Sequence, residues 1–112
     1  MMNRRIREAY EREANRIIEK HLSKLCLLSY EDALKLPESD GHDCSVASLD
    51  ASVTVFRQTS PYGLDGQVLV TVLVARSIFA GMFQKHIEKG LVFSPNAATR
   101  VATEIELQNT GG

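Results

Sequence analysis

Residues 67–76 constrain the fold of this chain more than any other stretch. Six of the eight residues from Val68 to Ala75 are Val or Leu, and the Asp65-Gly66 pair just before them is a turn signal. A short apolar run that does not alternate with polar residues is typical of a strand covered on both faces. The segment therefore predicts the central strand of a sheet.

The residues before this run predict that the sheet is antiparallel. Residues 52–59 have strand alternation, and residues 60–66 form a turn of hairpin length that leads into the central strand. Residues 44–49 have weaker strand character and follow a polar loop at 37–43. We expect residues 52–59 to pair with 67–76, inside an antiparallel sheet that spans 44–93.

Residues 77–93 fit two different structures. Phe83 and Ile87 share one helical face, but together with Leu91 they also fit one face of a bent strand. A hairpin continuation extends an antiparallel sheet in the simplest way, and Gly81 would cost a helix about 1 kcal/mol. The strand is the favoured prediction.

The first quarter of the chain predicts a long amphipathic helix over residues 3–28. A second helix start at Ser29 predicts a short helix at 30–36, and a further short helix is expected near the C-terminus, before a flexible tail at 109–112. The apolar stripe of the long helix follows the helical period. It consists of Ile6, Tyr10, Ala14, Ile17, Ile18, Leu22, Leu25 and Leu28.

These elements predict one α+β domain over residues 1–112, in which the long helix packs on a three- or four-stranded antiparallel sheet. Hydrophobic residues at 44% and charged residues at 24% are ordinary globular values. The chain has neither an apolar run near the ~20 residues of a membrane span nor a leader pattern. Cys26 and Cys44 are expected to be reduced thiols, which favours a cytoplasmic location.

The charges divide between two neighbouring segments. Residues 1–28 carry seven basic against four acidic residues, and residues 29–50 carry six acidic residues against Lys35. Because the helix also exceeds the length that one small core needs, we expect a homodimer with a self-complementary seam. Its expected interface consists of Arg4, Arg5, Ile6, Arg7, Tyr10 and Ile17.

The sequence gives no strong catalytic or metal-binding pattern, so no catalytic residue, metal or cofactor is predicted. His42, Asp43 and Cys44 are neighbours, but adjacent side chains on an extended chain point in opposite directions. A polar loop is the better interpretation of this segment.

A cavity between the helix and a curved sheet would have a different set of residues. His21 lies within the apolar stripe, and His86 is the better placed acid–base group. Arg57 and Arg76 end two paired strands and could together bind a carboxylate or phosphate. The predicted ligand-binding set is Tyr10, His21, Phe56, Arg57, Arg76 and His86.

Three functions follow from these patterns, and the first is favoured. It is a non-enzymatic interaction or accessory module that acts as a homodimer with an unidentified protein partner. The alternative is a small-ligand-binding or enzymatic domain of the cone-like, cystatin-like arrangement, and the third is weak nucleic-acid binding through the N-terminal arginines, which we expect to be the least favoured. A pocket holding unpaired polar groups would favour the ligand hypothesis, and a filled core with an apolar surface patch would favour the interaction hypothesis.

Overall fold

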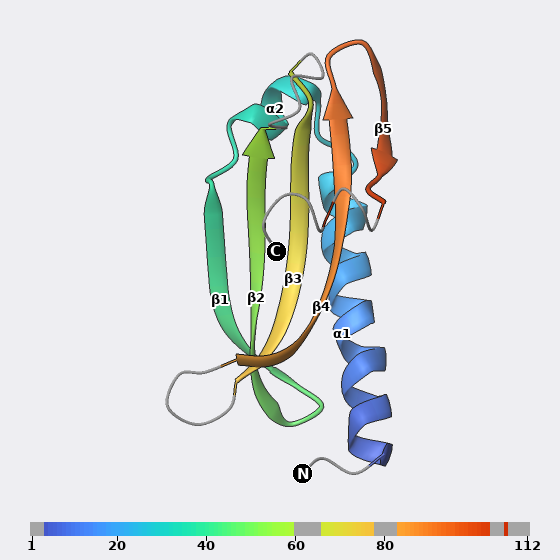
Figure 1. The fold of residues 1–112 in the computed structure, drawn as a ribbon, viewed down its shortest axis with the longest axis vertical. Helices are drawn as coiled ribbons and strands as arrows, with labels where there is room; N and C mark the ends of the chain where they lie inside the picture. The colour runs from blue at the N-terminus through green and yellow to red at the C-terminus, as the bar shows by residue number, and fades with distance from the viewer. Residues whose placement is uncertain (1–3, 60–65, 78–82, 104–106, 108–112) are drawn as a thin grey trace.

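An N-terminal helix packs on a five-stranded antiparallel sheet in the computed structural model, which describes residues 4–59, 66–77, 83–103 and 107 (Figure 1). The elements are α1 (Arg4–Leu25), α2 (Tyr30–Leu34), β1 (Ser39–Val46), β2 (Leu49–Thr59), β3 (Val68–Ser77), β4 (Phe83–Ser94) and β5 (Ala97–Val101). The predicted α+β class, with an N-terminal helix packed on an antiparallel sheet, is thus confirmed.

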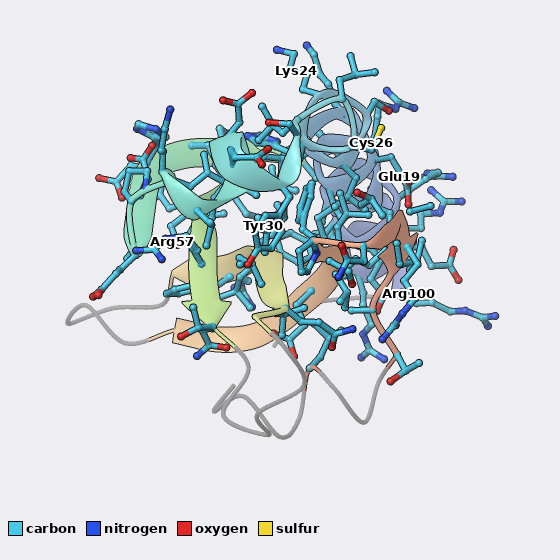
Figure 2. All side chains as sticks on the ribbon, turned by 90° about the horizontal axis from the view of Figure 1, so that it is seen from above. Glu19, Lys24, Cys26, Tyr30, Arg57 and Arg100 are labelled. Atoms are coloured by element: carbon cyan, nitrogen blue, oxygen red, sulfur yellow. The ribbon has the colours of Figure 1, made fainter. Side chains whose placement is uncertain are left out.

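The strands follow one another across the sheet in chain order, and β3 is the central strand. Viewed along α1, the sheet is curved, with both helices on its concave side (Figure 2). The predicted pairing of 52–59 with 67–76 is confirmed, because Ser52 lies opposite Ala75 and Thr59 lies opposite Val68. The strand prediction for 77–93 is also confirmed where the chain is described, since β4 pairs with β3 along its length.

The sheet has five strands in place of the predicted three or four, because its last strand was missed and its first strand begins earlier than predicted. Residues 37–43 were predicted to be a loop, yet β1 starts at Ser39 and pairs with β2 as far as Val46. An edge strand needs apolar side chains on neither face, so the polar composition of β1 hides its strand character. At the other edge, residues 97–101 form β5.

The predicted strand at 44–49 is in fact divided by a tight turn. Ala47 and Ser48 have φ values of 50° and 67°, the left-handed pair that a two-residue hairpin turn requires. The Glu13 carboxylate of α1 accepts a hydrogen bond of 2.7 Å from the Ala47 backbone N–H. This hydrogen bond connects the turn between β1 and β2 to α1.

The central strand is buried on both faces, as its sequence predicts. On the concave face Val68, Val70, Val72 and Val74 are each 0% exposed. On the convex face Leu69 and Thr71 are also buried, at 5% and 7% exposure. The concave core is completed by Tyr10, Ala14, Ile18, Leu22, Ala33, Val46, Ala51, Val53, Leu91 and Phe93, and the smaller convex cluster by Val92, Ala102 and Leu107.

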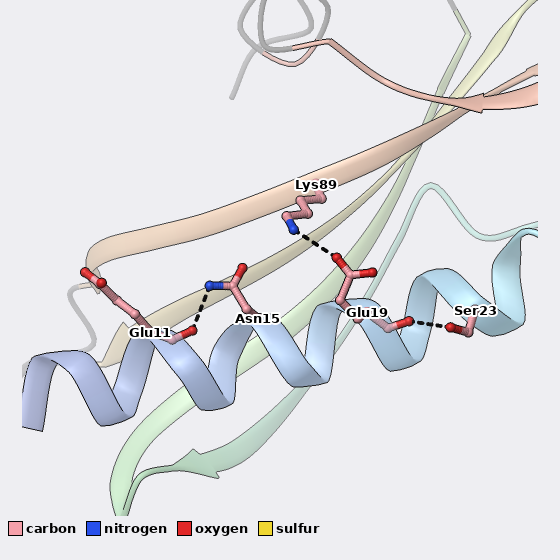
Figure 3. Close-up of polar contacts among 5 residues, drawn as sticks. All are labelled: Glu11, Asn15, Glu19, Ser23 and Lys89. Atoms are coloured by element: carbon pink, nitrogen blue, oxygen red, sulfur yellow. Dashed lines mark hydrogen bonds and ion pairs between the residues drawn. The ribbon is translucent and has the colours of Figure 1, made fainter.

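Polar contacts fix one side of α1 over β4 (Figure 3). The Lys89 ammonium of β4 donates to the Glu19 carboxylate at 2.9 Å. On the same side of the helix, Asn15 and Ser23 donate to the backbone carbonyls of Glu11 and Glu19. The opposite side of α1 therefore faces β1 and β2.

The short helix after α1 begins as predicted. The Ser29 hydroxyl accepts a hydrogen bond of 3.1 Å from the Asp32 backbone N–H, which is the expected N-cap. The helix ends at Leu34, earlier than predicted. The expected C-terminal helix falls mainly on residues 104–106, and the tail at 109–112, which lie outside the described residues.

The length of α1 matches the sheet. Its 22 residues span roughly 33 Å, and the 11 residues of β2 span roughly 37 Å. The premise that this helix is too long for one core is therefore wrong, and the homodimer loses that support. Within the described residues, no helix has the length and apolar composition needed to cross a membrane.

Candidate functional site: a groove between α1 and the first two strands

A half-open cavity of about 350 Å³ lies between α1 and the β1–β2 hairpin. Typical small-molecule sites in proteins have volumes of about 300–1,000 Å³, so this groove is large enough for a small ligand. Its lining residues are Ile17, Lys20, His21 and Lys24 from α1, Cys44 from β1 and Val53 from β2.

The helical period brings the α1 residues of the groove together. Lys20 and Lys24 follow Ile17 by three and seven positions, so all three lie on the side of the helix away from Glu19. Lys24 extends from the end of α1 (Figure 2). These two ammonium groups make one wall of the groove cationic.

One hydrogen bond indicates the tautomer of the neutral His21 ring. Its Nδ1 lies 3.0 Å from the backbone carbonyl oxygen of Ile17. A carbonyl oxygen only accepts, so in the neutral ring Nδ1 carries the proton and Nε2 keeps a free lone pair. His21 can therefore accept a hydrogen bond from a ligand in the groove.

The strand side of the groove leads to a row of residues across three strands. Cys44 lies opposite Ala51, and Ala51 lies opposite Arg76, so all three occupy the concave face. Tyr10 from α1, which is 0% exposed, packs in the same core as Ala51.

Two buried polar atoms in this region have no hydrogen-bond partner among the described residues. They are the hydroxyl oxygen of Tyr10 and Nε of Arg76. Buried polar groups in folded proteins are nearly always hydrogen-bonded, and a missing bond costs about 1–3 kcal/mol. We call Tyr10, Cys44 and Arg76 the inner cluster.

Electrostatics keep both acidic groups of the inner cluster protonated. Burial raises the pKa of the Tyr10 phenol, Cys44 raises it further, and Arg76 partly offsets both. Burial likewise raises the pKa of the Cys44 thiol, with added contributions from Asp43 and Glu13. The thiol is therefore a poor nucleophile at neutral pH.

The predicted ligand-binding residues are only partly brought together. His21 lines the groove, whereas Tyr10 and Arg76 do not line it and are connected to it through Cys44. Phe56 is on the convex face, because it pairs with Thr71. The side chain of His86 lies outside the described part of the structure.

The predicted pairing of Arg57 with Arg76 is wrong. The two strands run antiparallel, so their last residues lie at opposite ends: Arg57 is opposite Val70, and Arg76 is opposite Ala51. The six-residue offset corresponds to about 20 Å along the strand. The Arg57 Nε donates instead to the Leu36 carbonyl oxygen at 2.6 Å, beyond α2 (Figure 2).

The remaining metal-site candidates and the predicted interface residues lie outside the groove or have other roles. His42 Nε2 lies 3.5 Å from an Asp40 carboxylate oxygen, and both side chains are solvent-exposed. In the part of the chain that is described, no group of three His, Cys, Asp or Glu side chains could hold a metal ion. The predicted interface residues Arg4, Arg5, Ile6 and Arg7 are exposed, but Tyr10 is buried inside the protomer and Ile17 lines the groove.

Sequence reasoning missed four groove residues, namely Lys20, Lys24, Cys44 and Val53. The helical periodicity places Lys20 on the polar face, where lysine normally contacts solvent alone. Its position one turn after Ile17 is the signal that could have identified it. Cys44 was weighed together with His42 and Asp43 as part of a polar loop, because β1 begins at Ser39, earlier than the predicted strand at 44–49.

Comparisons with protein-family models, with curated proteins and with solved structures give no match to this chain.

Proposed function

We propose that this protein is a small-ligand-binding domain whose ligand occupies the groove between α1 and the β1–β2 hairpin. The observation that carries the proposal is a cavity of about 350 Å³ lined in part by Cys44, which lies in the same row of the sheet as Arg76. Arg76 Nε is one of two buried side-chain atoms without a hydrogen-bond partner among the described residues. Such a combination of apolar walls with a few convergent polar groups is typical of ligand sites.

Binding is favoured over a docking role for a reason visible on the surface. Among the residues whose burial is described, the exposed large hydrophobic side chains belong to four separate segments, with Ile6 on α1, Leu27 after it, Leu34 on α2 and Val101 on β5. A protein-docking surface normally gathers such side chains into one patch. The homodimer, an unidentified protein partner and nucleic-acid binding stay predictions from the sequence.

Binding is also favoured over catalysis. The raised pKa of Cys44 keeps its thiol protonated, and His21 is the histidine in the groove. The His21 Nδ1 is already hydrogen-bonded to the Ile17 carbonyl oxygen, whereas a thiol nucleophile is activated by a base within hydrogen-bond reach. The groove residues therefore act as hydrogen-bonding and charged contacts for a ligand.

The two cysteines allow a direct test with an internal control. Cys44 lines the groove, whereas Cys26 is exposed beyond the end of α1 and donates to the Ser23 carbonyl oxygen. The protein is alkylated with iodoacetamide in the presence of a fragment mixture that contains anionic, cationic and neutral compounds. Mass spectrometry then follows the rate at each thiol.

A ligand in the groove slows the alkylation of Cys44 and leaves the rate at Cys26 unchanged. With ligand at ten times its dissociation constant, mass action predicts about tenfold slower reaction. Equal rates with and without every class of fragment, or equal slowing of both thiols, contradict the proposed function.

A further inference from the structure

The inner cluster consists of hydrogen-bond donors. The phenol of Tyr10 is kept protonated by burial, and Arg76 Nε–H can only donate. The Cys44 thiol is protonated for the same reason and is a weak donor. The Tyr10 hydroxyl can also accept, but Arg76 Nε–H can only donate, so a ligand group that pairs with this cluster must accept hydrogen bonds.

The sheet register brings these donors to one place. Cys44 and Arg76 stand on either side of Ala51 in one row of the concave face, roughly 10 Å apart between Cα atoms. Tyr10 belongs to the same buried cluster as Ala51, and Cys44 also lines the groove. The inner cluster therefore meets the groove at Cys44, whereas Tyr10 and Arg76 are not among the residues that line it. We call the Cys44 end of the groove its inner end.

The charges around this end favour an anion over a neutral acceptor. Lys20 and Lys24 line the groove, and Arg76 is in the cluster. Two carboxylates also act on Cys44, those of Asp43 and Glu13, and the Glu13 carboxylate accepts a hydrogen bond from the Ala47 backbone N–H. The cationic side chains, Lys20, Lys24 and Arg76, outnumber them. A guanidinium with its fork of donors is suited to a carboxylate or phosphate group.

We propose that the ligand carries a carboxylate or phosphate group that inserts at the inner end of the groove and accepts hydrogen bonds from Tyr10 and Arg76. This inference rests on the proposed function, and it adds the chemical class of the ligand. Lys20 and Lys24 attract the same anion toward the groove, and His21 Nε2 accepts from a donor elsewhere on the ligand.

Matched pairs of probes test the charge requirement. Benzoate and benzamide have the same ring and nearly the same shape, but only benzoate is an anion. Inorganic phosphate is the third probe, which separates a phosphate ligand from a carboxylate. Binding is measured by NMR titration of the amide signals and by protection of Cys44 from alkylation.

Three variants connect binding to the cluster. Tyr10→Phe removes only the hydroxyl, Arg76→Gln removes the charge, and Arg76→Lys keeps the charge without the fork. Arg57→Gln is the matched control, because Arg57 lies on the same strand pair at the opposite end. Near-UV circular dichroism and the NMR spectrum first establish that each variant is folded.

We expect benzoate or phosphate to bind at least tenfold more tightly than benzamide. The Arg76→Gln and Tyr10→Phe variants should each weaken anion binding about tenfold or more, because hydrogen bonds to charged groups are the strong ones. The Arg57→Gln variant should bind as the parent protein does.

The two proposals fail in different ways. Equal binding of benzoate and benzamide in the groove, or anion binding that survives Arg76→Gln, overturns the anion inference and leaves the ligand groove standing. If no fragment of any class protects Cys44, the proposed function itself is wrong.

Discussion

Replacing Tyr10 by Phe is expected to stabilise the ligand-free protein. Tyr10 is 0% exposed, and its hydroxyl has no hydrogen-bond partner among the described residues. A buried polar group without a partner costs about 1–3 kcal/mol, while the ring of Phe keeps the packing of the Tyr ring. We therefore expect a gain of about 1 kcal/mol, or about 4 °C in the unfolding midpoint for a chain of this size.

Tyr30 is a matched control within the same chain. Its hydroxyl donates to the Gly66 carbonyl oxygen, so Tyr30→Phe removes a bond that the folded state makes. The expected loss is about 1 kcal/mol. The two conservative changes should therefore shift stability in opposite directions.

Urea and thermal unfolding, followed by far-UV circular dichroism at neutral pH without ligand, measure both changes. The transitions should have equal m values, so that midpoint differences report stability. If Tyr10→Phe lowers stability by as much as Tyr30→Phe does, the Tyr10 hydroxyl has a partner in the folded protein. The argument for an acceptor at the inner end of the groove would then fail.

Three further predictions concern other parts of the fold. Gly90→Ala should cost about 1–3 kcal/mol in chemical unfolding, because a Cβ there would lie 2.9 Å from the Val70 carbonyl oxygen and 3.1 Å from Leu107 Cδ2. Gly41→Ala should cost less, because its Cβ would meet mainly the movable Thr54 side chain, at 3.0 Å. Equal losses of stability in the two variants would contradict this packing. The double change Ala47→Asn and Ser48→Gly should raise the thermal midpoint by several degrees, because Asn-Gly is the preferred pair for this left-handed turn and other residues there cost about 1–2 kcal/mol each. A lowered midpoint would contradict the turn geometry. The free energy of unfolding, measured between pH 8 and 11, should fall as pH rises above the ordinary pKa values of 9.0 for Cys44 and 10.0 for Tyr10, because the unfolded chain releases protons that the folded protein keeps. Tyr10→Phe and Cys44→Ser should each reduce this loss of stability. If neither variant changes the dependence of stability on pH, the raised pKa values are refuted.

The centre of the fold could be predicted from sequence because its side chains are buried. The Val-rich run of β3 and the stripe of α1 follow the periods of strand and helix, and burial on the sheet's two faces explains both patterns. The Ser29 cap and the Gly66 turn, where φ is 73°, were also visible as local chemistry.

The edges could not be predicted because backbone pairing determines them. The polar residues of β1 pair with β2 through main-chain hydrogen bonds, which leave no pattern in the side chains. The Ala47-Ser48 turn has neither Gly nor Asn, and a distant residue, Glu13, supports it. Such contacts depend on tertiary structure and have no local signal.

The candidate site was partly predicted for a similar reason. His21, Tyr10 and Arg76 were chosen by their positions on the expected helix and strand. His21 lines the groove, whereas Tyr10 and Arg76 are connected to it through Cys44. Arg57 was wrongly predicted to lie near Arg76, because two antiparallel strands have their last residues at opposite ends of the pair. Cys44 was missed because it stands at the start of the weak predicted strand, next to polar residues 42 and 43 that were interpreted as a loop.

The location of bound small molecules tests the central claim most directly. In an amide-resolved NMR titration of the full chain with the mixed fragments, our account predicts that shifts concentrate on residues 17–24 of α1 and 44–53 of the β1–β2 hairpin. Arg57 and the convex face near Phe56 should be unaffected. Shifts confined to the convex face, or none up to the solubility limit of the fragments, would contradict a ligand site in the groove.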